Sequence, residues 1–88
     1  MERAIITGAL AGLHCGDSAI IESIDLPDPD ARRLMELGFL PGTRVTVGRS
    51  GPGGDPRVFQ VDGSEIALRR QTALRIGIRP VPASEERL

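Results

Sequence analysis

The chain has 88 residues, of which 40% are apolar and 26% are charged, and its formal net charge is −1. A chain of this length forms one domain with a modest core, and because Phe39 and Phe59 are its only aromatic residues, that core must be largely aliphatic. All 11 basic residues are arginine, so there is no phosphate-loop lysine and no Schiff-base lysine, which excludes a P-loop NTPase. The near-neutral charge also lacks the basic excess of a dedicated nucleic-acid-binding protein.

The cysteine content and the apolar segments bear on location. Cys15 is the only cysteine, so no internal disulfide can form and the chain fits a reducing compartment. The apolar run 4–13 is interrupted by Gly8 and Gly12 and follows no clearly basic region, which is unlike a signal peptide. No run reaches the roughly 18 apolar residues of a membrane helix. We therefore expect a cytoplasmic protein.

The first elements are short. Ile5 and Ile6 indicate a short strand, and residues 9–13 indicate a helical turn. Residues 17–24 indicate a strand whose alternation is imperfect, so both of its faces are expected to be partly covered.

A short helix is predicted to follow. Asp28 is a suitable N-cap, and Pro29 suits the first helical position because its missing N–H costs nothing there. Asp30 adds negative charge at the positive end of the helix dipole. Leu34 and Met35 lie on one face and are expected to face the barrel, because a helix this short is not stable alone.

The helix is expected to end abruptly. Gly38 is placed where a helix stops in a left-handed residue. Pro41 and Gly42 fill the centre of a type II turn. The chain then enters a strand over residues 43–49, whose valines are expected to face inward.

The second half of the chain is organised by turns. Residues 50–56 hold three glycines and two prolines, and they predict a loop too long for a tight hairpin. Asp62 and Gly63 tolerate the positive φ of a type I′ turn and predict a tight hairpin. The other expected elements are strands at 57–61, 64–68 and 76–81, one helical turn at 71–74, and a frayed tail at 82–88.

These segments together predict a mainly β fold in a single domain over residues 1–88, with its core at about 10–81. It contains about five short strands and one short inserted α-helix. Short strands need closure to satisfy their edges, so a small, partly open β-barrel with the helix plugging one side is the most economical arrangement.

Four segments resemble the FeoA family: RRLMELGFLPGTRVTV at 32–47, the glycine-rich loop ending in GDP at 54–56, VDG at 61–63, and EIALRRQTALRI at 65–76. The resemblance covers roughly residues 10–81. It implies an SH3-like barrel and a small cytoplasmic accessory protein of bacterial ferrous iron transport. The implied partner is the membrane transporter FeoB, which carries its own cytoplasmic GTPase domain. The implied role is to bind the cytoplasmic part of that transporter and to support or regulate Fe(II) uptake.

The residues that carry chemistry are few. His14 and Cys15 are adjacent, and neighbours on a strand point to opposite faces, which disfavours a Cys–His catalytic pair. With Asp17 they make a weak candidate metal site that supplies at most three ligands. Capping accounts for the acidic residues around the helix start. We expect no catalytic residue, no metal site and no cofactor.

The arginines near the C-terminus allow two interpretations. Arg69, Arg70, Arg75 and Arg79 can form a basic stripe for an acidic partner or RNA, or they can be solvated outward positions between inward aliphatics, which we favour. Barrels that bind nucleic acid usually add stacking aromatics, and this segment has none. The same scarcity argues against recognition of proline-rich peptides.

The candidate partner surface surrounds the helix end. Leu37, Phe39 and Leu40 cannot all face the core from one helix and one turn, and exposed apolar side chains often mark partner sites. Phe39 can alternatively fold back as the hydrophobic contact of the helix cap. We expect these three residues to bind the partner, with Gly53 and Asp55 of the glycine-rich loop as an adjacent lip.

The sequence thus predicts a non-enzymatic interaction module. The first alternative is a metal-binding or metal-sensing SH3-like domain, because FeoA-like barrels resemble the C-terminal domains of iron-dependent repressors. The second alternative is a small RNA-binding barrel, which a steeply salt-dependent affinity for RNA would favour.

Overall fold

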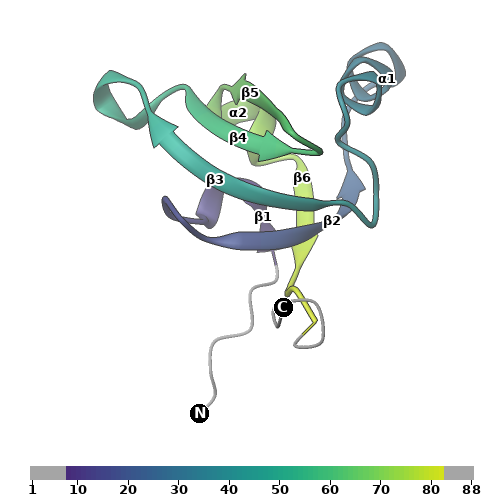
Figure 1. Ribbon diagram of the computed structural model, residues 1–88. Coiled ribbons are helices and arrows are strands. Elements are labelled where there is room, and N and C mark those ends of the chain that lie inside the picture. The colour runs from purple at the N-terminus through teal and green to yellow at the C-terminus, as the bar shows by residue number, and fades with distance from the viewer. Residues whose placement is uncertain (1–7, 83–88) are drawn as a thin grey trace.

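The computed structural model describes residues 8–82, which form one six-stranded antiparallel sheet in the order β1-β6-β2-β3-β4-β5. The sheet curls into a small, partly open barrel (Figure 1). In chain order the elements are β1 (Gly8–Ala9), η1 (Leu10–Gly12), β2 (Ser18–Ile24), α1 (Asp28–Glu36), β3 (Arg44–Ser50), η2 (Pro52–Gly54), β4 (Arg57–Val61), β5 (Ser64–Leu68), α2 (Arg70–Ala73) and β6 (Ile76–Arg79). The mainly β barrel with one short inserted helix is confirmed.

Two irregularities allow the short strands to curl. The ladder between β2 and β6 shifts register between Ile21 and Ser23, and the ladder between β3 and β4 shifts between Val47 and Ser50. Register shifts of this kind bend a strand and increase its twist. The chain therefore closes most of the barrel without long strands.

The core is built from alternating side chains, as the pattern predicts. Val45 and Val47 of β3 are buried, as are Phe59 and Val61 of β4. Successive residues of a strand point to opposite faces, so each of these pairs contributes to the same interior. The side chains with no exposed surface are Leu10, Ala19, Ile21, Phe39, Val45, Phe59, Val61 and Ile76.

One strand was not expected. Gly8 and Ala9 form β1 by pairing with Ile78 and Gly77 of β6, so the sheet has six strands where about five were predicted. Two residues give no periodicity from which a strand can be recognised. The expected strand at Ile5–Ile6 and residues 83–88 of the expected tail lie outside the described residues.

The start of α1 corrects another expectation. Pro27, not Asp28, is the N-cap, and its carbonyl oxygen accepts the hydrogen bond of the Ala31 amide at 2.9 Å. Asp28 is the first helical residue, and no side chain caps the helix. Asp28 and Asp30 both lie in the first turn, where their charge still complements the helix dipole.

Candidate functional site

Three large apolar side chains are exposed where α1 ends and the chain turns into β3. Met35 is 39% exposed, and Leu37 and Leu40 are each 45% exposed. We call these three residues the helix-end surface. Met35 was expected to face the barrel. It lies at the border of the buried face that Ala31 and Leu34 define, so the helix leaves its side chain in solvent.

The helix cap determines which residues are exposed. Gly38 has φ +111°, and its amide donates to the carbonyl of Met35 at 3.0 Å. The amide of Phe39 donates to the carbonyl of Leu34, also at 3.0 Å. These two bonds define a Schellman motif, in which the residue after the glycine packs on the last helical turn. Leu37, the last residue before the glycine, is left pointing outward.

Phe39 therefore does not belong to the exposed surface, contrary to the expectation. Its side chain is 0% exposed and belongs to the same core cluster as Leu34. The fold-back alternative is the one the structure adopts. A buried Phe39 fixes the position of the exposed leucines on either side of it, so its contribution to this surface is structural.

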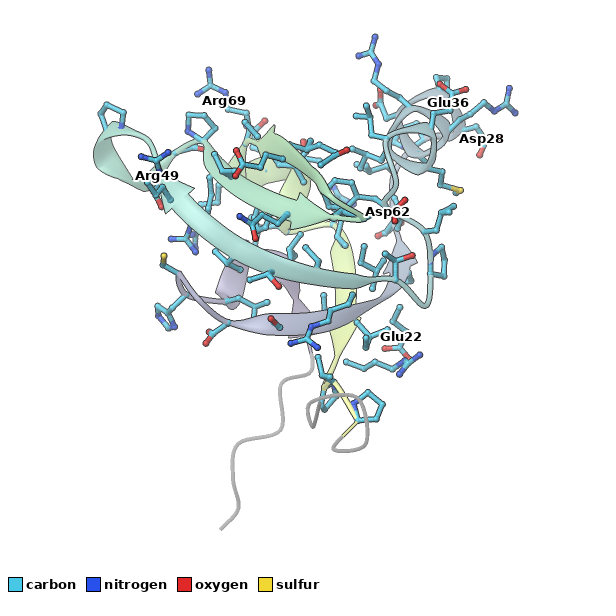
Figure 2. All side chains as sticks on the ribbon, viewed as in Figure 1. Glu22, Asp28, Glu36, Arg49, Asp62 and Arg69 are labelled. Atoms are coloured by element: carbon cyan, nitrogen blue, oxygen red, sulfur yellow. The ribbon has the colours of Figure 1, made fainter. Side chains whose placement is uncertain are left out.

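The helix end lies against the β4–β5 hairpin. A Cβ built on Gly38 would lie 3.4 Å from Cγ1 of Val61 and 3.8 Å from Cβ of Asp62. Figure 2 shows Asp62 at the tip of this hairpin beside α1, with Glu36 and Asp28 on the helix above it. The hairpin turn has the predicted left-handed residues, with φ +51° at Asp62 and +81° at Gly63.

The turn that follows the helix end is also as predicted. The Thr43 amide donates to the Leu40 carbonyl at 3.0 Å, and Gly42 has φ +94°, which is the geometry of a type II turn. This turn presents Leu40 immediately before β3 begins. Local backbone chemistry alone thus fixes both ends of the exposed segment.

Gly53 and Asp55 are not adjacent to this surface. β3 separates them from the helix end by seven residues, or about 20 Å of extended strand, and Figure 1 shows α1 and the β3–β4 loop at opposite ends of the barrel. Gly53 is exposed. The Asp55 carboxylate accepts a hydrogen bond at 3.0 Å from the amide of Arg70, the first residue of α2, so Asp55 fixes the start of that helical turn.

A groove lies between α1 and β5. Its volume is about 260 Å³, and its lining includes Leu34 and Leu37 of α1 together with Ile66, Ala67 and Leu68 of β5. Leu37 thus belongs both to this groove and to the helix-end surface. No sequence pattern indicates the groove, because its two walls are about thirty residues apart in the chain and meet only in the folded barrel.

The weak candidate metal residues form a turn. The Asp17 carboxylate accepts a hydrogen bond from the His14 amide at 2.8 Å, and the His14 carbonyl accepts one from the Asp17 amide at 2.9 Å. His14 and Cys15 are exposed. Within residues 8–82, no group of three or more His, Cys, Asp or Glu side chains is arranged to hold a metal ion.

The four C-terminal arginines do not form one stripe. Arg70 starts α2, where its amide binds Asp55, and the Arg75 guanidinium lies 3.5 Å from the Asp25 carboxylate. Arg79 is on β6, opposite Ile20 of β2. All of them are exposed, as outward positions between inward aliphatics should be.

No helix within the described part of the chain is long and apolar enough to cross a membrane.

The curled antiparallel sheet with its inserted helix places the chain among small SH3-like barrel domains. The FeoA domain model matches residues 9–80, and the chain belongs to the FeoA family. That family is associated with ferrous iron transport.

Solved structures of FeoA proteins share this fold. The FeoA protein from Chlorobium tepidum superposes with a TM-score of 0.80 at 32% identity, over 90% of this chain and 75% of that one. Stenotrophomonas maltophilia FeoA complexed with zinc, a prokaryotic SH3 domain protein, gives 0.69 at 42% identity, over 80% of this chain and 87% of that one.

A curated relative joins this domain to a transporter. The Fe(2+) transport protein A/Fe(2+) transporter FeoB fusion protein of Porphyromonas gingivalis is 29% identical over 75 residues. The match covers 85% of this chain but only 9% of the fusion protein, so this chain corresponds to a small part of that relative.

Proposed function

We propose that this chain is a non-enzymatic, cytoplasmic accessory module of ferrous iron uptake that binds the cytoplasmic part of a FeoB-type transporter. The observation that carries the proposal is the helix-end surface, where Met35, Leu37 and Leu40 are exposed while the cap buries Phe39. Exposed apolar side chains often mark partner sites, and these three follow one another closely in the chain. A partner that covers them recovers the burial that the fold leaves incomplete.

The fusion of an FeoA domain to FeoB in Porphyromonas gingivalis supports the choice of partner. Two domains joined in one chain are held at a high effective concentration. A weak interface is then sufficient to keep the fused domains in contact. A separate chain of the same family lacks this linkage, so its surface alone must provide the affinity for the partner.

The test is a calorimetric titration of the purified protein against the cytoplasmic portion of the FeoB-type transporter from the same organism. The titration measures the dissociation constant of the complex. Leu40→Asp should weaken binding by at least about tenfold, because a partly buried charge has no counterpart in an apolar interface. Leu74→Asp is the matched control. Leu74 is 51% exposed, but it is the C-cap of α2 and lines a pocket with Leu26 and Pro27, which precede the start of α1 and not its end.

Both variants are expected to fold, because neither side chain belongs to the core. Equal binding by Leu40→Asp and the unmodified protein would refute the role of the helix-end surface. Saturable binding that both variants weaken equally would place the interface elsewhere.

A further inference from the structure

β5 is one of the two edge strands of the sheet, and β1 is the other. It pairs with β4 on one side and, among residues 8–82, with no strand on the other. The five paired positions from Ser64 to Leu68 run without a bulge and contain no proline and no lysine. Natural proteins block edge pairing with devices that include proline, charged residues and bulges. The one charged residue of this edge is Glu65, so the backbone of the edge is open to pairing.

The hairpin register identifies the backbone groups that are free. Val61 and Ser64 flank the two-residue turn, so they exchange hydrogen bonds, and the pattern then alternates along the ladder. Ile66 and Leu68 bond to β4 in the same way. The amides and carbonyls of Glu65 and Ala67 therefore point away from β4, and both residues are exposed.

The groove between α1 and β5 runs along this edge. Leu34 and Leu37 line it from the helix, and Ile66 and Leu68 line it from the strand, which makes its floor apolar. An added strand lies about 4.8 Å from its neighbour. A single extended segment therefore reaches the free groups of β5 while its side chains contact the helix.

The helix wall of the groove carries one charge of each sign. Asp30 and Arg33 both line it, one helical turn apart, and neither side chain makes an ion pair or a hydrogen bond with another described residue. A segment with one basic and one acidic side chain complements this wall. The occupant for which the groove is suited is therefore an extended, amphipathic peptide segment, not a purely apolar one.

We propose that a partner binds by adding an extended segment to the edge of β5, with its backbone paired to Glu65 and Ala67, its apolar side chains on Leu34, Leu37 and Ile66, and opposite charges facing Asp30 and Arg33. This inference rests on the proposed function, since the segment belongs to the transporter's cytoplasmic portion. It deepens that function because it specifies the mode of recognition, which is strand addition. Leu37 connects the groove to the helix-end surface, so one partner can occupy both.

Amide hydrogen exchange followed by NMR tests the pairing directly. In the free protein the amides of Ile66 and Leu68 should exchange slowly and those of Glu65 and Ala67 rapidly, because only the first pair is bonded within the sheet. Adding the transporter's cytoplasmic portion should slow Glu65 and Ala67 by at least about tenfold. Binding that leaves these two amides unprotected would overturn the inference while leaving the proposed function in place.

A proline substitution removes the donor at the edge. Ala67→Pro deletes an amide that β4 does not use, and proline is tolerated at such edge positions, so binding should weaken by about tenfold or more. Ala67→Thr keeps the amide and suits a strand, and it should bind as the unmodified protein does. If Ala67→Pro fails to fold, the exchange pattern of the unmodified protein still decides.

Three further outcomes distinguish strand addition from the proposed function and from self-association. If Leu40→Asp abolishes binding and Ala67→Pro does not, the helix-end surface stands and strand addition is refuted. If Glu65 and Ala67 are already protected in the free protein and it sediments as a dimer, a second copy occupies the edge and the partner segment is refuted. If the unmodified protein does not bind the transporter portion at all, the proposed function and this inference both fail.

Discussion

Replacing Gly38 by alanine tests whether the cap positions the helix-end surface. Gly38 has φ +111°, a backbone conformation that costs an L-residue with a Cβ about 1–2 kcal/mol. The new Cβ would lie 3.4 Å from Val61, an ordinary van der Waals contact that adds little. Part of this cost is offset because alanine lowers the conformational entropy of the unfolded chain. The expected net loss in the free energy of unfolding is therefore about 1 kcal/mol.

The assay is thermal unfolding followed by circular dichroism. For a domain of this size, a loss of about 1 kcal/mol lowers Tm by about 4–8 °C. Gly12→Ala is the matched control, because Gly12 lacks a positive φ and a Cβ there meets nothing within 4 Å. Gly38→Asn should lose less than Gly38→Ala, since asparagine tolerates the left-handed conformation. Equal Tm values for Gly38→Ala and Gly12→Ala would refute the reasoning.

Two further substitutions test the neighbouring contacts. In urea unfolding, Phe39→Ala should lower the free energy of unfolding by about 3–5 kcal/mol, because it empties a fully buried site, and Phe39→Leu should lower it less. A loss below about 1 kcal/mol for Phe39→Ala would mean that the ring is not a core residue. Asp55→Ala should lower the free energy of unfolding by about 1 kcal/mol, because it removes the acceptor of the first α2 amide. Asp55→Asn keeps an oxygen acceptor and should lower it less. Equal stability of the two variants would show that this bond does not stabilise α2.

Local backbone chemistry explains why much of the fold was predictable. Asp62 and Gly63 form the expected left-handed hairpin turn, and Gly38 has the positive φ expected at the end of α1. These residues act through their own φ preferences, which need no knowledge of the rest of the chain. Alternation likewise placed Val45 and Val47 inside, because a strand that faces a core on one side has only two choices of register.

The exposed surface was harder to predict. The sequence showed that Leu37, Phe39 and Leu40 cannot all be buried, but it did not determine which would be. The cap bonds and the position of the β4–β5 hairpin decided that Phe39 turns inward. Met35 was expected to be buried because apolar periodicity assigns it to the same helix face as Ala31 and Leu34. The buried part of this helix is narrower and includes only Ala31 and Leu34.

The sequence by itself determined the turns, the strands other than β1, the helix and the family, since each depends on neighbouring residues or on a continuous motif. Only the tertiary structure decided where those elements meet. It placed Asp55 beside α2 instead of the helix end, and it made Leu37 of α1 and Ile66 of β5 line the same groove. The physical reason is that the curl of the sheet sets contacts between distant residues, and that curl arises from strand twist and register shifts summed over the whole barrel.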